Sequence, residues 1–105
     1  MSRGPLQRLQ DIEDQIALTL QDDNIRAQCY GLIVIGEACK HLPGSWCALE
    51  PEIPWQRICG MRDFLAHQYH RVDPQIVEAT VRLQLPPLAT AIHRLQRKVE
   101  EGDLA

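Results

Sequence analysis

Residues 25–42, IRAQCYGLIVIGEACKHL, decide the fold, because their apolar side chains cover more than one stripe of a helix. A helix with one apolar stripe packs against one neighbour, whereas a broader apolar surface has to be covered on two sides. We therefore expect this stretch to be a helix buried against two surfaces. Its apolar set includes Cys29, Leu32, Ile33, Ile35, Gly36 and Cys39.

Two residues of this expected helix call for an explanation. Gly36 costs helix stability relative to alanine by up to about 1 kcal/mol, and the close crossing of another helix is the usual reason for keeping it. Glu37 stands beside it in an apolar context. Two interpretations of Glu37 stay open: an ion pair with an arginine of the fold such as Arg62, or a charge on the solvated edge of the helix.

Helical patterns continue on both sides of residues 25–42. Pro5 suits a first helical position, and apolar residues then recur every three or four positions as far as Leu20. Residues 22–24, Asp-Asp-Asn, offer alternative N-caps for the helix that follows. Asp73-Pro74 is a strong helix start, and we expect Pro86-Pro87 to kink or restart that last helix, because each proline removes a backbone donor.

The segment between these helices is expected to be irregular at first and then helical. Pro54 should start a short helical turn, Gly60 should bend the chain, and a further helix should begin near Met61. Phe64 and Leu65 are expected to carry the buried face of that helix. The irregular part has three expected anchors, Trp46, Leu49 and Ile53.

These elements predict an all-α protein, an antiparallel up-and-down bundle of four to five helices. At 105 residues the chain is expected to form one domain, residues 1–105, with a tail that frays from about residue 100. No segment has the pattern of a strand. Apolar stripes that are too wide for a single partner also predict dimerisation.

Composition and charge exclude some of the functions that the protein could have. A net charge of −3 and a pI near 5.7 argue against a protein that coats polyanions, so RNA would bind at a local patch around Arg57, Arg62 and Arg71. No signal peptide and no membrane-spanning run is evident, which predicts a cytoplasmic protein without a membrane partner. The four cysteines form no C-x2-C pair and are expected to be buried thiols.

Residues 60–73, GMRDFLAHQYHRVD, concentrate the ionisable side chains. Arg62 supplies a planar cation that fits phosphate oxygens, and His67 can exchange a proton near neutral pH. In a metal-free cleavage of RNA, His67 would deprotonate a ribose 2′-hydroxyl or protonate the departing 5′ oxygen, while Arg62 would hold the phosphate. Tyr69 would add a hydroxyl donor or stack on a base.

The spacing of Arg62 and His67 sets a geometric condition. On an unbroken helix, side chains five positions apart point about 140° away from each other. Convergence therefore needs either a helix that loosens near His67 or a second copy of the chain that completes the site. Purely structural interpretations also stay open. His67 is favoured at a helix C-terminus by the dipole, and Arg62 has three candidate ion-pair partners, Asp63, Glu37 and Glu52.

Arg62-x4-His67-x-Tyr69, with an acid directly after the arginine, resembles the R-x4-6-H signature of the HEPN superfamily, and the tyrosine narrows this to its HepT-like branch. Residues 34–38, VIGEA, and residues 51–55, PEIPW, also look like that branch. The likeness covers roughly residues 25–95. It implies the same helical architecture, usually as a homodimer in which the two motifs face one cleft, with pairing into tetramers left open.

The resemblance further implies a metal-independent endoribonuclease, the toxin of a HepT/MntA-type toxin–antitoxin pair. Arg62 and His67 would be catalytic, with Asp63 in support, and Tyr69 would contact RNA and receive AMP from a nucleotidyltransferase antitoxin, which switches the toxin off. No cofactor is expected, and a metal site at Cys59, His67 and His70 is the weaker interpretation. The alternative function is a non-catalytic helical dimer that binds a nucleotidyltransferase.

Three features depart from the HepT-like pattern. Asp63 stands where asparagine is more common, and its charge would either weaken phosphate binding or orient Arg62. His70 replaces an aromatic residue that commonly follows the tyrosine. The region between the first two helices also looks short, which would alter the rim of the cleft and with it the choice of substrate or the docking of the antitoxin.

Overall fold

The computed structural model describes residues 4–102, apart from the side chain of Tyr69. Within this range the chain forms five α-helices and one short 3-10 helix, and no strand, which confirms the predicted all-α bundle. The last residues of the tail expected to fray lie outside the described range. The elements are α1 (Pro5–Gln21), α2 (Ile25–Lys40), α3 (Gly44–Cys47), α4 (Trp55–Gln68), η1 (Tyr69–Arg71) and α5 (Pro74–Glu100).

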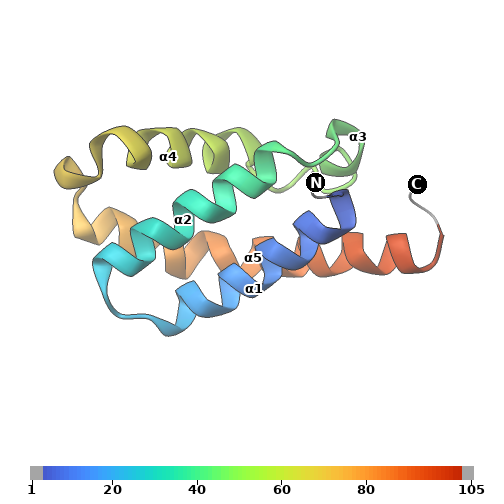
Figure 1. The fold of residues 1–105 in the computed structure, drawn as a ribbon, viewed down its shortest axis with the longest axis horizontal. Coiled ribbons are helices and arrows are strands. Elements are labelled where there is room, and N and C mark those ends of the chain that lie inside the picture. The colour runs from blue at the N-terminus through green and yellow to red at the C-terminus, as the bar shows by residue number, and fades with distance from the viewer. Residues whose placement is uncertain (1–3, 103–105) are drawn as a thin grey trace.

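Helix α2 is the centre of the bundle, as its apolar pattern predicts. It contacts α1, α4 and α5, whereas α4 packs mainly on α2. Figure 1 shows α1 and α5 running side by side along one side of the molecule and α4 on the other, with α2 crossing between them. Among the described helices, none is both long enough and apolar enough to cross a membrane.

Local chemistry sets the helix starts where the sequence predicts them. Pro5 is the first residue of α1. Of the three candidate caps before α2, Asn24 is the one used, and its side chain accepts hydrogen bonds from the backbone N–H groups of Arg26 and Ala27 at 2.9 and 3.3 Å. Asp73 caps α5 by accepting from the N–H of Gln75 at 2.8 Å.

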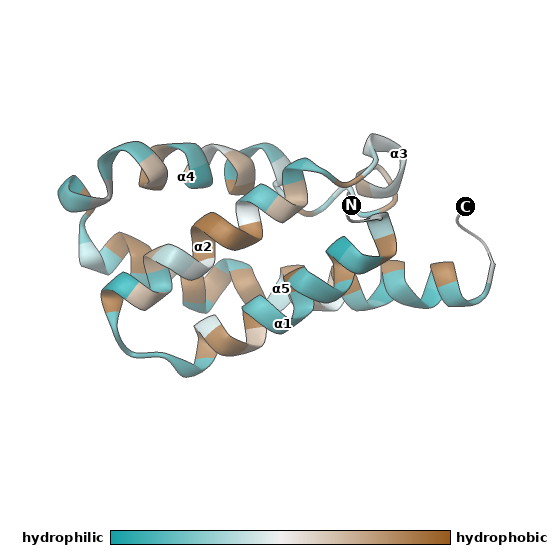
Figure 2. Cartoon of the chain, viewed as in Figure 1, coloured by the Kyte–Doolittle hydropathy of each residue, from teal (hydrophilic) through white to brown (hydrophobic). Residues whose placement is uncertain are grey.

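The core is aliphatic and lies where α1, α2 and α5 face one another. Figure 2 shows hydrophobic residues gathered on these facing sides, while α4 is largely hydrophilic or intermediate. Burial of these side chains supplies most of the driving force for folding. The largest fully buried apolar side chains are Leu9, Ile12, Ile16, Ile35, Leu65, Leu85, Leu88, Ile92 and Leu95.

Three details of α4 and the segment before it correct the sequence predictions. Helix α4 is continuous from Trp55, so Gly60 does not bend the chain. Leu65 is fully buried, as expected, but Phe64 is 48% exposed because adjacent helical residues point about 100° apart. Leu49 is exposed and does not anchor the connecting segment, whereas Trp46 is buried there.

Helix α5 continues through Pro86 and Pro87, so of the predicted kink or restart the restart is excluded. The two prolines leave the carbonyl groups of Arg82 and Leu83 without their helical donors. All four of these residues are exposed, so water can hydrogen-bond to the two carbonyl groups. The two prolines therefore lower the stability of the helix less at these exposed positions than they would in the core.

The connection between α2 and α4 is fixed by polar contacts. Glu50 is buried, and its carboxylate accepts a hydrogen bond from Nε of Arg94 on α5 at 3.0 Å. The indole N–H of Trp55 donates to the carbonyl groups of Cys47 and Glu50 at 3.0 and 3.1 Å. The expected burial of the cysteines holds for Cys29 and Cys39, while Cys47 and Cys59 are partly buried; all four are free thiols.

Candidate active site at the crossing of α2 and α4

Gly36 lets α4 approach α2 at the position of Arg62. A Cβ atom on Gly36 would lie 2.3 Å from Cβ of Arg62 and 3.0 Å from the carbonyl oxygen of Ile58. The first distance is one that real Cβ atoms essentially never show, and the second is a tight contact to backbone that cannot rotate away. The close crossing predicted from Gly36 is thus confirmed, and it sets where Arg62 stands.

Arg62 lies between two carboxylates, one from each helix. Its Nε is 2.9 Å from Oε2 of Glu37 on α2, and its Nη1 donates to Oδ1 of Asp63 at 2.9 Å. The buried Nε–H is not aligned for a hydrogen bond, so the contact with Glu37 is an ion pair. Two of the ion pairs considered from the sequence, with Glu37 and Asp63, are therefore present.

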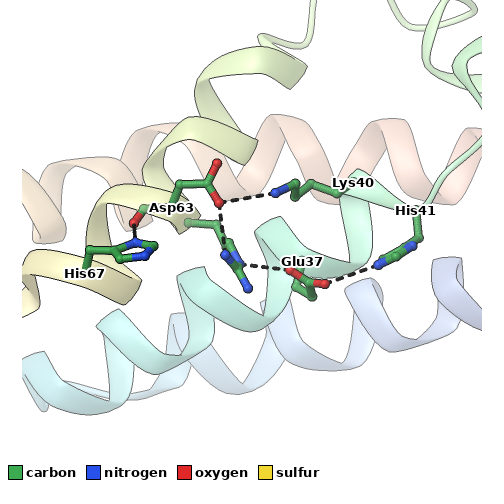
Figure 3. Close-up of polar contacts among 6 residues, drawn as sticks. Glu37, Lys40, His41, Asp63 and His67 are labelled. Carbon is green, nitrogen blue, oxygen red and sulfur yellow. Dashed lines mark hydrogen bonds and ion pairs between the residues drawn. The ribbon is translucent and has the colours of Figure 1, made fainter.

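Two further residues of α2 join this network, as Figure 3 shows. Nζ of Lys40 lies 3.2 Å from Oδ1 of Asp63, and Nε2 of His41 lies 3.1 Å from Oε1 of Glu37. From the sequence, no role was assigned to Lys40 or His41. Their spacing from Glu37, three and four positions on, was the available signal, because it places all three on one face of a helix.

The network keeps both carboxylates ionised. Hydrogen bonds from Arg62 and then Lys40 hold the pKa of Asp63 below its usual range. The hydrogen bond with His41, helped by the charge of Arg62, lowers the pKa of Glu37. At neutral pH, Arg62 and Lys40 therefore face two full negative charges.

His67 is held by its own helix. Its Nδ1 lies 2.8 Å from the carbonyl oxygen of Asp63 one turn earlier. A carbonyl oxygen only accepts hydrogen bonds, so Nδ1 carries the hydrogen and the lone pair of the neutral ring is on Nε2. His67 is exposed in the last turn of α4.

Within one chain, Arg62 and His67 do not converge. Helix α4 is α-helical to Gln68, and the tighter 3-10 turn begins only at Tyr69, too late to move His67 toward Arg62. The expected rotation of about 140° therefore stands. Figure 3 shows His67 on one side of Asp63 and Lys40 and His41 on the other.

The remaining predicted residues follow α4. The backbone of Tyr69 begins η1, but its side chain lies outside the described residues, and so does its expected contact with RNA. His70 is exposed in the same turn. In the part of the chain that the structure describes, no three His, Cys, Asp or Glu side chains are grouped so as to hold a metal ion, Cys59, His67 and His70 included.

Comparison with known proteins gives one family and several relatives. A family model described as "Ribonuclease HepT-like" matches residues 5–95. The chain is 39% identical over 66 residues to "Probable ribonuclease HepT" of Thermococcus cleftensis. It is 36% identical over 73 residues to a "Putative RNase" of Caldanaerobacter subterraneus subsp. tengcongensis, and 37% identical over 70 residues to a "Putative RNase" of Methanocaldococcus jannaschii.

The matches cover only part of the length of each relative. They cover 63%, 70% and 67% of this chain but 60%, 65% and 60% of the three relatives, in the order given. The chain therefore spans less than two thirds of the length of each. No solved structure matches the chain significantly.

Proposed function

Because the chain belongs to the ribonuclease HepT-like family, we propose that it is a metal-independent endoribonuclease with Arg62 and His67 as its catalytic residues. The observation that supports this best is the hydrogen bond from Nδ1 of His67 to the carbonyl oxygen of Asp63. It selects the tautomer whose exposed Nε2 is able to accept a proton. A general base requires this arrangement.

The proposed reaction uses the substrate's own nucleophile. Nε2 of His67 takes the proton of a ribose 2′-hydroxyl, and the 2′ oxygen attacks the adjacent phosphorus. The bond from phosphorus to the 5′ oxygen breaks, the leaving oxygen takes up a proton from water, and His67 returns its proton to water. The products are a 2′,3′-cyclic phosphate and a 5′-hydroxyl end. Arg62 binds the non-bridging oxygens and offsets the charge that develops on them.

We propose that two copies of the chain form this site together. Arg62 and His67 point apart on an unbroken α4, so a two-fold partner is the simplest way to bring Arg62 of one copy to His67 of the other. The side of α4 away from α2 carries the exposed Phe64, which lines an apolar groove with Met61 and Ile76. A second copy covering this groove would bury the exposed Phe64.

The chemistry is tested by cleavage of RNA in EDTA with purified protein. We expect wild type to cut and His67→Ala to lose at least about 100-fold in rate, because general acid–base groups contribute that much or more. His93→Ala, which alters an exposed histidine of α5, is the matched control and should cut like wild type. Cleavage that stops in EDTA, or that survives in His67→Ala, would contradict the mechanism.

The shared site is tested by mixing two inactive variants. Arg62→Ala and His67→Ala chains are unfolded together, refolded and assayed. In a mixed dimer with a shared site, one of the two sites keeps both catalytic residues, so random pairing should restore about a quarter of wild-type activity. No restoration, from chains that do form mixed dimers by native mass spectrometry, would show that each site uses one chain only.

We propose further that the protein is a HepT/MntA-type toxin whose Tyr69 receives AMP from a nucleotidyltransferase antitoxin. Tyr69 is two residues beyond His67, so a nucleotide there would add bulk and negative charge next to the proposed phosphate site. Intact mass after co-expression with a neighbouring nucleotidyltransferase should show AMP on wild type and none on Tyr69→Phe. If protein without AMP does not cleave RNA, the non-catalytic binding partner becomes the better proposal.

A further inference from the structure

We propose that Lys40 and Arg62 form a two-cation clamp for a phosphate of the RNA, and that the carboxylate of Asp63 occupies this clamp until RNA displaces it. The inference rests on the proposed ribonuclease function and adds to it a binding residue, Lys40, and a competing group within the chain. Asp63 then limits RNA affinity in addition to supporting His67 through its carbonyl oxygen.

The two cations converge on a single oxygen atom. Oδ1 of Asp63 lies 2.9 Å from Nη1 of Arg62 and 3.2 Å from Nζ of Lys40. The donors come from different helices, α4 and α2, and are brought together by the close crossing at Gly36. Carboxylate and phosphate oxygens accept the same charge-assisted hydrogen bonds at similar distances, so a position that holds one can hold the other.

Asp63 is well placed to leave the clamp. Its side chain is 50% exposed and that of Lys40 is 40% exposed, so solvent reaches both partners. Exposed ion pairs are weak, because water solvates the separated charges nearly as well. A phosphate that carries one negative charge would replace one carboxylate charge and leave the charge balance of the network unchanged.

Glu37 has a different role in the same network. It contacts the Nε side of Arg62, whereas Asp63 contacts Nη1, so removal of Asp63 leaves the pair with Glu37 in place. His41 holds the other oxygen of Glu37 at 3.1 Å. Glu37 is therefore a positioning residue that keeps Arg62 directed toward the clamp while RNA replaces Asp63.

The test measures binding apart from cleavage. A fluorescent oligoribonucleotide with 2′-O-methyl groups throughout lacks the nucleophile and cannot be cut, and its anisotropy gives the affinity at several salt concentrations. Lys40→Met should bind several-fold more weakly and lower the slope of log affinity against log salt by about 0.7, the loss of one single-strand phosphate contact. Lys40→Arg should restore both values.

The decisive variant is Asp63→Asn, which keeps the shape and removes the charge. We expect it to bind the oligonucleotide several-fold more tightly than wild type, because the competing carboxylate is gone. Weaker binding would mean that Asp63 helps Arg62 to bind phosphate, and would overturn the inference. Lys98→Met makes the same substitution on α5 and should bind like wild type. Equal weakening of Lys98→Met and Lys40→Met would also overturn it.

The outcome separates this inference from the ribonuclease proposal. If wild type cleaves unmodified RNA while Lys40→Met binds normally, the clamp is wrong and the ribonuclease stands. If the clamp variants behave as expected but wild type does not cleave, phosphate binding stands and catalysis fails. Wild type that neither binds nor cleaves RNA would overturn both. Circular dichroism melting of each variant confirms that it is folded.

Discussion

Helices α5 and α4 are attached to the molecule in different ways. Eight residues of α5 are buried, and seven of them, including Leu88, belong to the aliphatic core. In α4 only Leu65 is buried, although Ile58 and Met61 are partly buried against the core. The close approach at Gly36 sets where α4 crosses α2. The difference teaches that α5 contributes mainly to the core, whereas α4, which carries most of the candidate site, has fewer buried residues and depends on its crossing with α2 for its position.

The largest expected effect comes from removing a buried apolar side chain of α5. Leu88→Ala should lower the free energy of unfolding by about 2–5 kcal/mol, because it leaves a cavity in a fully buried position. Leu83→Ala, on the same helix but 60% exposed, should change it by less than about 0.5 kcal/mol. Urea unfolding followed by circular dichroism measures both. Equal losses would mean that α5 is not held by its buried face.

A smaller effect should mark the contact between α2 and α4. Gly36→Ala puts a Cβ 2.3 Å from Cβ of Arg62, and we expect a loss of about 1–3 kcal/mol in unfolding free energy. Gly60→Ala is the matched control, because nothing lies within 4 Å of its added Cβ. It should stabilise the protein by about 0.5–1 kcal/mol, since glycine is costly inside a helix. If both variants had the same unfolding midpoint, the close crossing would be refuted.

Gly36→Ala should also affect the site, because the added methyl group pushes Arg62 away from Glu37. We expect a loss of RNA cleavage in Gly36→Ala that exceeds what its reduced stability explains, measured at a temperature where the variant is folded. Gly60→Ala should retain cleavage.

The smallest expected effect is on the acid side of the stability profile. The folded-state pKa values of Glu37 and Asp63 lie below the ordinary values of 4.5 and 3.8. The unfolded chain therefore binds more protons in this range. The contribution of these groups to stability is complete above the ordinary values and is lost as pH falls through the lowered ones. Both side chains are substantially exposed, so the change is small.

Glu37→Gln isolates this effect. Urea midpoints of wild type and Glu37→Gln should differ at pH 7, and the difference should shrink once the pH falls below about 4.5. Glu78→Gln, an exposed position of α5, is the control variant. A difference between wild type and Glu37→Gln that stays constant down to pH 3 would show that the ion pairs with Glu37 add nothing to stability.

The sequence was sufficient where structure depends on neighbouring residues. A cap within residues 22–24 and the helix start at Asp73-Pro74 act over a few residues, and both are confirmed. Prediction from the sequence failed where contacts with an element distant in the chain determine which side chain is buried. Phe64 and Leu65 are adjacent and both apolar, and only the position of α2 determines that Leu65 is the buried one.

The residues of the candidate site also fall into those that the sequence predicted and those that it did not. Arg62, Asp63 and His67 were identified from one short segment, and the pair of Glu37 with Arg62 was one of two interpretations left open. Lys40 was missed because its contact with Asp63 links two helices far apart in the chain. The catalytic roles, the second copy and the modification of Tyr69 stay predictions, since each depends on a molecule other than this chain.

The pairing of α1 with α5 bears on how the chain is made. These helices lie side by side, yet α2, α3 and α4 separate them in the sequence. During synthesis, α1 and α2 can pair and α4 can settle on α2 while α5 is still inside the ribosome, but the apolar surface of α1 and α2 that α5 covers stays exposed until α5 emerges. Contacts between distant segments form late because closing a long loop is entropically costly. The nascent chain therefore exposes its future core, and not its motif helix, to chaperones.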